Sequence, residues 1–303
     1  MSIQLFIKHE ATITDDKDGL KMNCVIYCNF GDNYWVKKNF SSLRQLDYFK
    51  HFTIIDQNSL PNSNSPTLTL TDFDDCDFVE IFENPESPYQ HASYQHADAV
   101  NKVLKKLKCS CERIWIIDTD LFFSSSALDW LDDAMKTYEA IFMQDPVQPF
   151  FSHPCLCIIN RKNIDKIDFF PTEFDLIDLY GQKVRLIDTG RILAAKLAQE
   201  GVKVAIVRKN LERRFNSKIM KSTHHPDFYL DGEIVHFRSM SFSTKIEARQ
   251  RFRIMDRVRY LYPRRYVDKI VGESPSTFKK IFLFYELKRI VNYLRNLIYK
   301  DAK

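Results

Sequence analysis

Short apolar runs alternate with longer segments of helical spacing along most of the chain, a pattern typical of an α/β fold. In residues 94–107, for example, Ala97, Val100 and Val103 recur on one helical stripe. The pattern predicts one sheet with strands at 24–29, 51–56, 78–82, 113–118, 140–143, 155–160, 202–207 and 233–238. It predicts a polar loop at 57–67 and helices at 35–49, 94–107, 127–138 and 189–200. We therefore expect a sheet flanked by helices over residues 1–240, followed by a helical extension over 241–303.

The C-terminal segment 241–303 carries the positive charge of the chain. It has 16 Lys and Arg against 6 Asp and Glu, whereas residues 1–240 have 28 against 34, so the net charge of +4 hides a basic tail. Its last part, 279–303, has one apolar helical stripe: Leu283, Leu287, Ile290, Val291, Leu294, Leu297 and Ile298. Such a helix can lie on an anionic membrane surface or pack on the rest of the chain or a second subunit. Seven arginines between 249 and 265 lead us to favour an anionic partner surface over packing. Nucleic acid would meet the same charge, but we expect a membrane surface and no nucleic acid.

The seven glycines exclude several classes of nucleotide-binding protein. They stand at 19, 31, 181, 190, 201, 232 and 272, and no two lie within eight residues of each other. The loops of Rossmann dehydrogenases, P-loop ATPases and protein kinases all need closely spaced glycines that bring backbone amides up to phosphates. A nucleotide must therefore be held by other means.

The seven cysteines are expected to be reduced thiols, because the number is odd and the first ten residues lack the features of a secretory leader. No apolar run approaches the roughly 18 residues of a membrane span. We therefore expect a cytosolic protein, with the tail as a peripheral membrane contact. The two Cys-x-Cys pairs lack the Cys-x-x-Cys spacing of structural zinc, and Cys155-Leu-Cys is interpreted as part of a buried strand, which argues against zinc.

The strongest chemical signal is Asp118-Thr119-Asp120, directly after the predicted strand 113–118. Two carboxylates two residues apart in extended backbone lie on one face, where they can share a divalent cation. The carboxyl end of a strand is also where open α/β sheets bind ligands. The alternative is a solvated turn in which one of the aspartates caps the element that follows.

From CVIYCNFGDN through IWIIDTDLFF, the order of elements and motifs resembles the nucleotide-sugar-dependent glycosyltransferases of the GT-A fold, most closely family 2. The resemblance covers most of residues 24–239 and implies a Rossmann-type mixed sheet that binds Mn²⁺ or Mg²⁺. It also implies that Asp120 binds the metal while Asp118 contacts the ribose or a metal-bound water. It implies further donor contacts in three motifs: Asp56 of FTIIDQNS to the base, Asn29 or Phe30 of CVIYCNFGDN beside it, and Asn101 of SYQHADAVNKVL near the donor.

Three later features complete the predicted site. By resemblance, His236 in EIVHFRS closes the metal site, and Arg238 or Ser239 meets the diphosphate. Asp188 in LIDTG is the candidate general base of an inverting reaction, and the alternative is that Asp188 or Thr189 caps helix 189–200. His96 is expected to line the donor site, whereas His153-Pro154 is expected to shape a turn before a strand.

The sequence thus predicts a metal-dependent glycosyltransferase that moves one sugar, from UDP in the first instance, to a glycan or lipid-linked acceptor. The three tryptophans all precede the region where a processive synthase carries Gln-x-x-Arg-Trp, which favours single addition. Two alternatives stay open: a haloacid-dehalogenase-like phosphatase, whose nucleophile strand resembles Ile-Ile-Asp-Thr-Asp, and a non-catalytic protein that binds an anionic surface through its tail.

Overall fold

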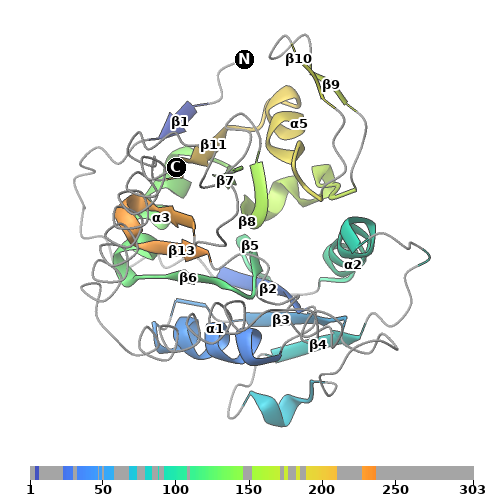
Figure 1. Cartoon of the computed structure of the whole chain (residues 1–303), viewed down its shortest axis with the longest axis vertical. Coiled ribbons are helices and arrows are strands. Elements are labelled where there is room, and N and C mark those ends of the chain that lie inside the picture. The colour runs from blue at the N-terminus through green and yellow to red at the C-terminus, as the bar shows by residue number, and fades with distance from the viewer. Residues whose placement is uncertain are drawn as a thin grey trace, which may run out of the picture.

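The computed structural model describes the central part of the chain (Figure 1). The described residues are 4–6, 23–29, 33–46, 48–49, 51–57, 68–73, 79–83, 88, 92–107, 110–145, 152–170, 174–176, 182–184, 189–209 and 227–236. The predicted tail 241–303 and the loop at 58–67 lie outside these ranges, so the domain boundary at 240 stays a prediction. None of the helices in the described part has the length and apolar character needed to cross a bilayer.

The fold is built on an eight-stranded sheet of order β1-β11-β7-β8-β5-β2-β3-β4. Its strands are β1 (Gln4–Phe6), β2 (Asn23–Asn29), β3 (His51–Asp56), β4 (Val79–Glu83), β5 (Arg113–Asp118), β7 (Ala140–Gln144), β8 (Ser152–Asn160) and β11 (Val204–Val207). Within this sheet β8 runs antiparallel to both of its neighbours, and the other pairings are parallel. The carboxyl ends of the parallel strands therefore meet the beginning of β8 at one edge. The predicted α/β mixed sheet is confirmed.

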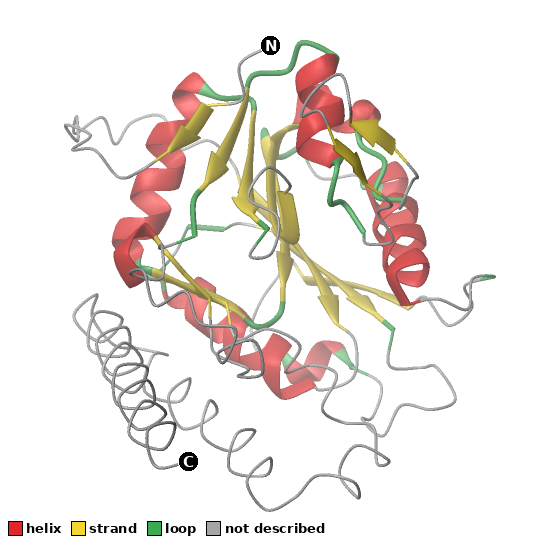
Figure 2. Ribbon diagram, turned by 45° about the horizontal axis from the view of Figure 1, so that its top comes forward, coloured by secondary structure: helices red, strands yellow, loops and turns green. Residues whose placement is uncertain are grey.

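Helices cover both faces of this sheet, as Figure 2 shows. The apolar stripes of α1 (Asn33–Gln45) and α3 (Ser125–Thr137) join one buried cluster, and those of α2 (Ala92–Lys106) and α5 (Leu193–Gln199) join another. Because neighbouring strand residues point to opposite faces, Val25 and Tyr27 of β2 belong to the first cluster and Ile26 to the second. Short 3₁₀ turns lie at Leu70–Asp72, Arg161–Lys166 and Leu230–Gly232. The result is a three-layer α/β/α arrangement.

A second, smaller sheet stands beside the first and corrects one prediction. It has the order β12-β13-β6, with β12 at Asp227–Tyr229, β13 at Ile234–His236 and β6 at Leu121–Phe123. The strand predicted at 233–238 therefore does not extend the main sheet. It pairs with β6, a three-residue strand too short for the sequence pattern to indicate. A further antiparallel pair joins β9 (Phe174–Leu176) to β10 (Gln182–Val184).

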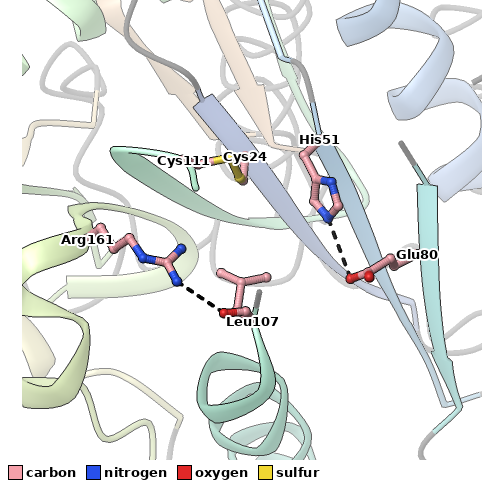
Figure 3. The surroundings of a disulfide bond; sticks show 6 residues. All are labelled: Cys24, His51, Glu80, Leu107, Cys111 and Arg161. Carbon is pink, nitrogen blue, oxygen red and sulfur yellow. Dashed lines mark hydrogen bonds and ion pairs between the residues drawn. A yellow bond between two sulfur atoms is a disulfide. The ribbon is translucent and has the colours of Figure 1, made fainter. Parts of the chain in front are cut away.

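The cysteine prediction is wrong for one pair: Cys24 and Cys111 form a disulfide bond across 87 positions (Figure 3). Cys24 lies near the start of β2, and Cys111 precedes β5, the neighbouring strand. Figure 3 also shows an ion pair at this end of the sheet, between His51 of β3 and Glu80 of β4. Their Nε2 and Oε2 atoms are 3.5 Å apart. The disulfide thus lies at the opposite end of the parallel strands from Asp118. Among the other cysteines in the described ranges, Cys28, Cys155 and Cys157 are free.

Candidate metal and nucleotide site

The Asp-x-Asp segment forms a tight connection between two strands. β5 ends at Asp118, Thr119 and Asp120 form a turn, and β6 begins at Leu121. The buried side chain of Asn39, on α1, donates hydrogen bonds to the carbonyls of Thr119, at 3.2 Å, and Leu121. The Asn39 amide, on the buried face of α1, therefore holds this turn in place.

His236 reaches this turn because of the register of the small sheet. It pairs with Leu121 in the antiparallel ladder of β13 and β6, so its side chain comes beside Asp120. Its Nε2 lies 3.2 Å from Asp120 Oδ1 and 3.6 Å from Asp118 Oδ2. The side chains of Asp120 and His236 are 4% and 3% exposed, whereas that of Asp118 is 28% exposed. The alternative of a solvated turn is therefore wrong for Asp120.

Burial and neighbouring charged groups shift the pKa values of Asp118 and His236 in opposite directions. Burial raises the pKa of the Asp118 carboxyl, but His236, with His96 and His153, outweighs burial and holds that pKa below its usual value. Burial lowers the pKa of His236, but Cys155, Asp120 and Asp118 oppose it and leave the pKa of the imidazole well above its usual range. The Asp118 carboxyl and the His236 imidazole thus each stabilise the charged form of the other.

The three side chains fit a divalent cation. Their ligand atoms lie within 4.8 Å of one another and supply two carboxylate oxygens and one imidazole nitrogen. Ligands at right angles on an ion bound at about 2.1 Å are about 3 Å apart, close to the separations of His236 from the two carboxylates. Oxygen donors with one imidazole suit Mn²⁺ or Mg²⁺. Of the three side chains, that of Asp118 is the most exposed.

Asn29 and Asp56, the predicted base contacts, lie together at the ends of neighbouring strands. Asn29 Nδ2 donates to Asp56 Oδ1 at 3.3 Å and to Asn33 Oδ1 at 2.8 Å, and Asp56 Oδ2 accepts from the Leu68 amide at 3.0 Å. Both Asp56 oxygens are therefore used within the protein. Asn29 Oδ1, by contrast, is buried without a hydrogen bond among the described residues.

The two predicted donor contacts on α2 have different surroundings. His96 lies close enough to Asp118 to lower the pKa of that carboxyl. Asn101 donates to Asp168 Oδ1 at 2.9 Å and accepts from the Phe169 amide at 3.1 Å. The Asn101 amide thus joins α2 to the segment after β8, whereas His96 lies near Asp118.

His153 belongs to the site, which corrects its assignment to a turn before a strand. It lies within β8, and its ring centroid is 5.0 Å from that of His236. Burial and His236 lower the pKa of His153 to about 4, and burial raises the pKa of the neighbouring Cys155 thiol to about 11. Two buried aspartates near His153 have basic partners. Arg191 Nε pairs with Asp145 at 2.8 Å, and Lys209 pairs with Asp227 at 2.6 Å.

Four predicted site residues, Phe30, Asp188, Arg238 and Ser239, lie outside the described residues, so their roles stay predictions. The structure does correct the alternative role of Asp188 or Thr189 as a helix cap. Helix α5 begins at Leu193 with Ile192 at the cap position, and residues 189–192 form a turn instead of the predicted first helical turn. Neither Asp188 nor Thr189 stands at the beginning of this helix.

Among known proteins, the chain is similar only to solved structures. No protein-family model matches the chain, and no curated protein matches it either. A mannosyltransferase from Pyrobaculum calidifontis, solved with GDP-Man and Mn²⁺, is 13% identical with a TM-score of 0.45, over 97% of this chain and 84% of that one. Glucosyl-3-phosphoglycerate synthase from Mycobacterium tuberculosis, solved with Mn²⁺, UDP and glucosyl-3-phosphoglycerate, is 12% identical with a TM-score of 0.44, over 68% and 77%.

A protein of another kind is also similar. 4-Diphosphocytidyl-2C-methyl-D-erythritol synthase from Anaerococcus prevotii is 10% identical with a TM-score of 0.40, over 62% of this chain and 87% of that one. The first two proteins belong to the class of enzyme that the sequence resembles. At these identities and TM-scores, the function of this chain has to be argued from its own residues.

Proposed function

We propose that the chain is a metal-dependent glycosyltransferase that moves a single sugar from a UDP-sugar to a glycan or lipid-linked acceptor. The observation that carries the proposal is the convergence of Asp118, Asp120 and His236 at the carboxyl edge of the sheet, with ligand atoms within 4.8 Å. A cation bound there would stabilise the negative charge of a diphosphate leaving group without proton transfer. That chemistry is the main requirement of glycosyl transfer from a nucleoside diphosphate.

In the proposed reaction each residue of the site has a distinct role. Asp120 and His236, both buried, would hold the cation, and Asn39 keeps the turn that carries Asp120 in place. Asp118, the more exposed carboxylate, would supply a further ligand and face the ribose. Asn29 Oδ1 would accept a hydrogen bond from the base, since it is buried without a hydrogen bond among the described residues. Asp56 orients the Asn29 amide by accepting from its Nδ2. This differs from the direct role that the sequence assigned to Asp56.

We also propose where the acceptor is met. The basic segment 241–303 would hold the protein to an anionic membrane surface on the cytosolic side, where a lipid-linked acceptor is presented. Its charge of 16 basic against 6 acidic residues supports this role. Arg238 and Ser239 would contact the diphosphate.

The proposal is tested by the products that the purified protein makes. With Mn²⁺ and a panel of UDP-sugars, we expect UDP to be released, slowly by hydrolysis and faster with a suitable acceptor, and chelator to stop the release. The same protein should leave p-nitrophenyl phosphate intact. Hydrolysis of that ester without UDP release would instead support the phosphatase alternative.

Asp188 is proposed as the general base, and its variant separates chemistry from binding. Asp188→Asn keeps the size of the side chain but cannot accept the acceptor proton, so turnover should fall by about a hundredfold or more. UDP affinity and melting temperature should stay close to those of the wild type. The measurement is a progress curve of UDP release at saturating donor; normal turnover would remove Asp188 from this role.

A further inference from the structure

A second group of metal-binding side chains lies directly beside the carboxylate site and shares one residue with it. Ligand atoms of His153, Cys155 and His236 lie within 4.8 Å of one another. We infer that these three residues form a thiolate–imidazole site for Zn²⁺ or a similarly soft divalent cation, and that its occupation excludes Mn²⁺ from the carboxylate site. The inference goes beyond the proposed function, and the binding test below does not depend on that function.

An irregularity in β8 places Cys155 in this position. Along the edge with β7, Phe142 pairs with Cys157 but Met143 pairs with His153, so β8 carries extra residues between these pairs. In a regular strand, Cys155 and Cys157 would share a face. Instead Cys155 belongs to the buried cluster on the side of α1 and α3, whereas Cys157 belongs to the cluster on the other face. The bulge thus turns the Cys155 side chain away from the side of Cys157.

His236 is placed to serve either cation but not both. Its Nε2 faces the two carboxylates, whereas its Nδ1 is buried without a hydrogen bond among the described residues. A buried polar atom left in this way is unfavourable unless it finds a partner, and a cation would supply one. A neutral imidazole has a single lone pair, so one His236 ring binds one cation at a time.

His153 completes the set. Its Nδ1 accepts a hydrogen bond from the Cys155 amide at 3.1 Å, which anchors the ring and leaves Nε2 as the nitrogen for a ligand. Binding through Nε2 moves the ring proton to Nδ1 and gives up that one hydrogen bond. Ligands around tetrahedral zinc lie about 3.5 Å apart, so side chains whose ligand atoms lie within 4.8 Å of one another need to approach by up to about 1.3 Å. Water would take the fourth position.

The choice of cation follows from the donors. Thiolate with imidazole selects zinc and other soft ions, whereas the carboxylates of Asp118 and Asp120 prefer harder Mn²⁺ or Mg²⁺. Neither Cys-x-Cys pair of the sequence is needed to hold this cation. The site inferred here uses one cysteine and two histidines from β8 and β13, which the sequence does not place together.

Cobalt is a direct probe, because Co²⁺ bound to thiolate gives a charge-transfer absorption band in the near ultraviolet. The full-length protein, stripped with chelator in thiol-free buffer, should show this band on titration with Co²⁺, and Zn²⁺ should remove it. Cys155→Ser should lose the band. Cys157→Ser, changed at another buried cysteine of β8, should keep it. Absence of the band in the wild type, or its persistence in Cys155→Ser, would overturn the inference.

Two additions keep the test decisive. If Cys155→Ser melts much earlier than the wild type, Cys155→Ala serves in its place, and His153→Asn should weaken Co²⁺ binding by about tenfold or more. Addition of Zn²⁺ to Mn²⁺-loaded wild type should release free Mn²⁺, measured by electron paramagnetic resonance. Release of Mn²⁺ by Zn²⁺ with no thiolate band for Co²⁺ would mean that zinc enters the carboxylate site, which contradicts the inference. Failure to bind Mn²⁺ with a normal thiolate band would instead count against the proposed function and against the exclusion of Mn²⁺, and would leave the thiolate–imidazole site in place.

Discussion

Asp120→Asn is expected to lower the rate of UDP release by about a thousandfold or more while the protein stays folded. The substitution keeps the size of the side chain but removes the charge next to His236 Nε2, 3.2 Å away. A bound cation contributes several kcal/mol to stabilising the leaving group, and about 1.4 kcal/mol corresponds to a factor of ten in rate. The measurement is kcat/KM for UDP release across a range of Mn²⁺ concentrations.

The control for this variant is Asp133→Asn, an acidic residue on α3 whose side chain is 43% exposed. It should change the rate by less than about twofold. In chelator, the melting temperature of Asp120→Asn should stay within a few degrees of that of the wild type. A rate near the wild-type value for Asp120→Asn at every Mn²⁺ concentration would remove Asp120 from the metal site.

Asp132→Ala is expected to lower the free energy of unfolding by about 3 to 5 kcal/mol, without any role in the site. Asp132 is the ion-pair partner of Arg113, whose side chain is 2% exposed in β5, and it also accepts a hydrogen bond from Tyr48 at 2.8 Å. Its removal leaves a buried guanidinium without its carboxylate, which costs far more than the loss of an exposed pair. For a domain of this size, the melting temperature should fall by about 10 °C.

The matched control is the next residue on the same helix. Asp133 pairs with Lys136 at 3.4 Å, and both side chains are largely in solvent, so Asp133→Ala should cost no more than about 0.5 kcal/mol. Both variants are compared with the wild type by urea unfolding and by thermal melting. Equal, small effects of the two substitutions would show that Arg113 does not depend on Asp132.

Local patterns predicted the parts of the site that lie on regular elements. The apolar run before Asp118 marks the end of a central strand, and the two carboxylates of the predicted pair come together there as expected. The resemblance added His236, whose position was not evident from its own strand. Contact between His236 and Asp120 depends on β6, which has only three residues.

The parts that the sequence missed depend on contacts between distant segments. Only Asn39 could have been noticed from the sequence, because it is a polar residue on the apolar helical face formed by Val36, Phe40 and Leu43. The side chain of Cys155 could not be placed by alternation, because the bulge in β8 reverses the face. The Cys24–Cys111 disulfide likewise requires knowing that β2 and β5 are neighbours.

The most direct test of the metal site is calorimetric titration of the wild-type protein with UDP, once in Mn²⁺ and once in chelator. We expect saturable binding in Mn²⁺ and an affinity at least about tenfold lower in chelator, a difference of about 1.4 kcal/mol. That difference should disappear in Asp120→Asn. Equal affinity of the wild type for UDP with and without the metal would contradict the claim that Asp118, Asp120 and His236 hold a cation for the nucleotide.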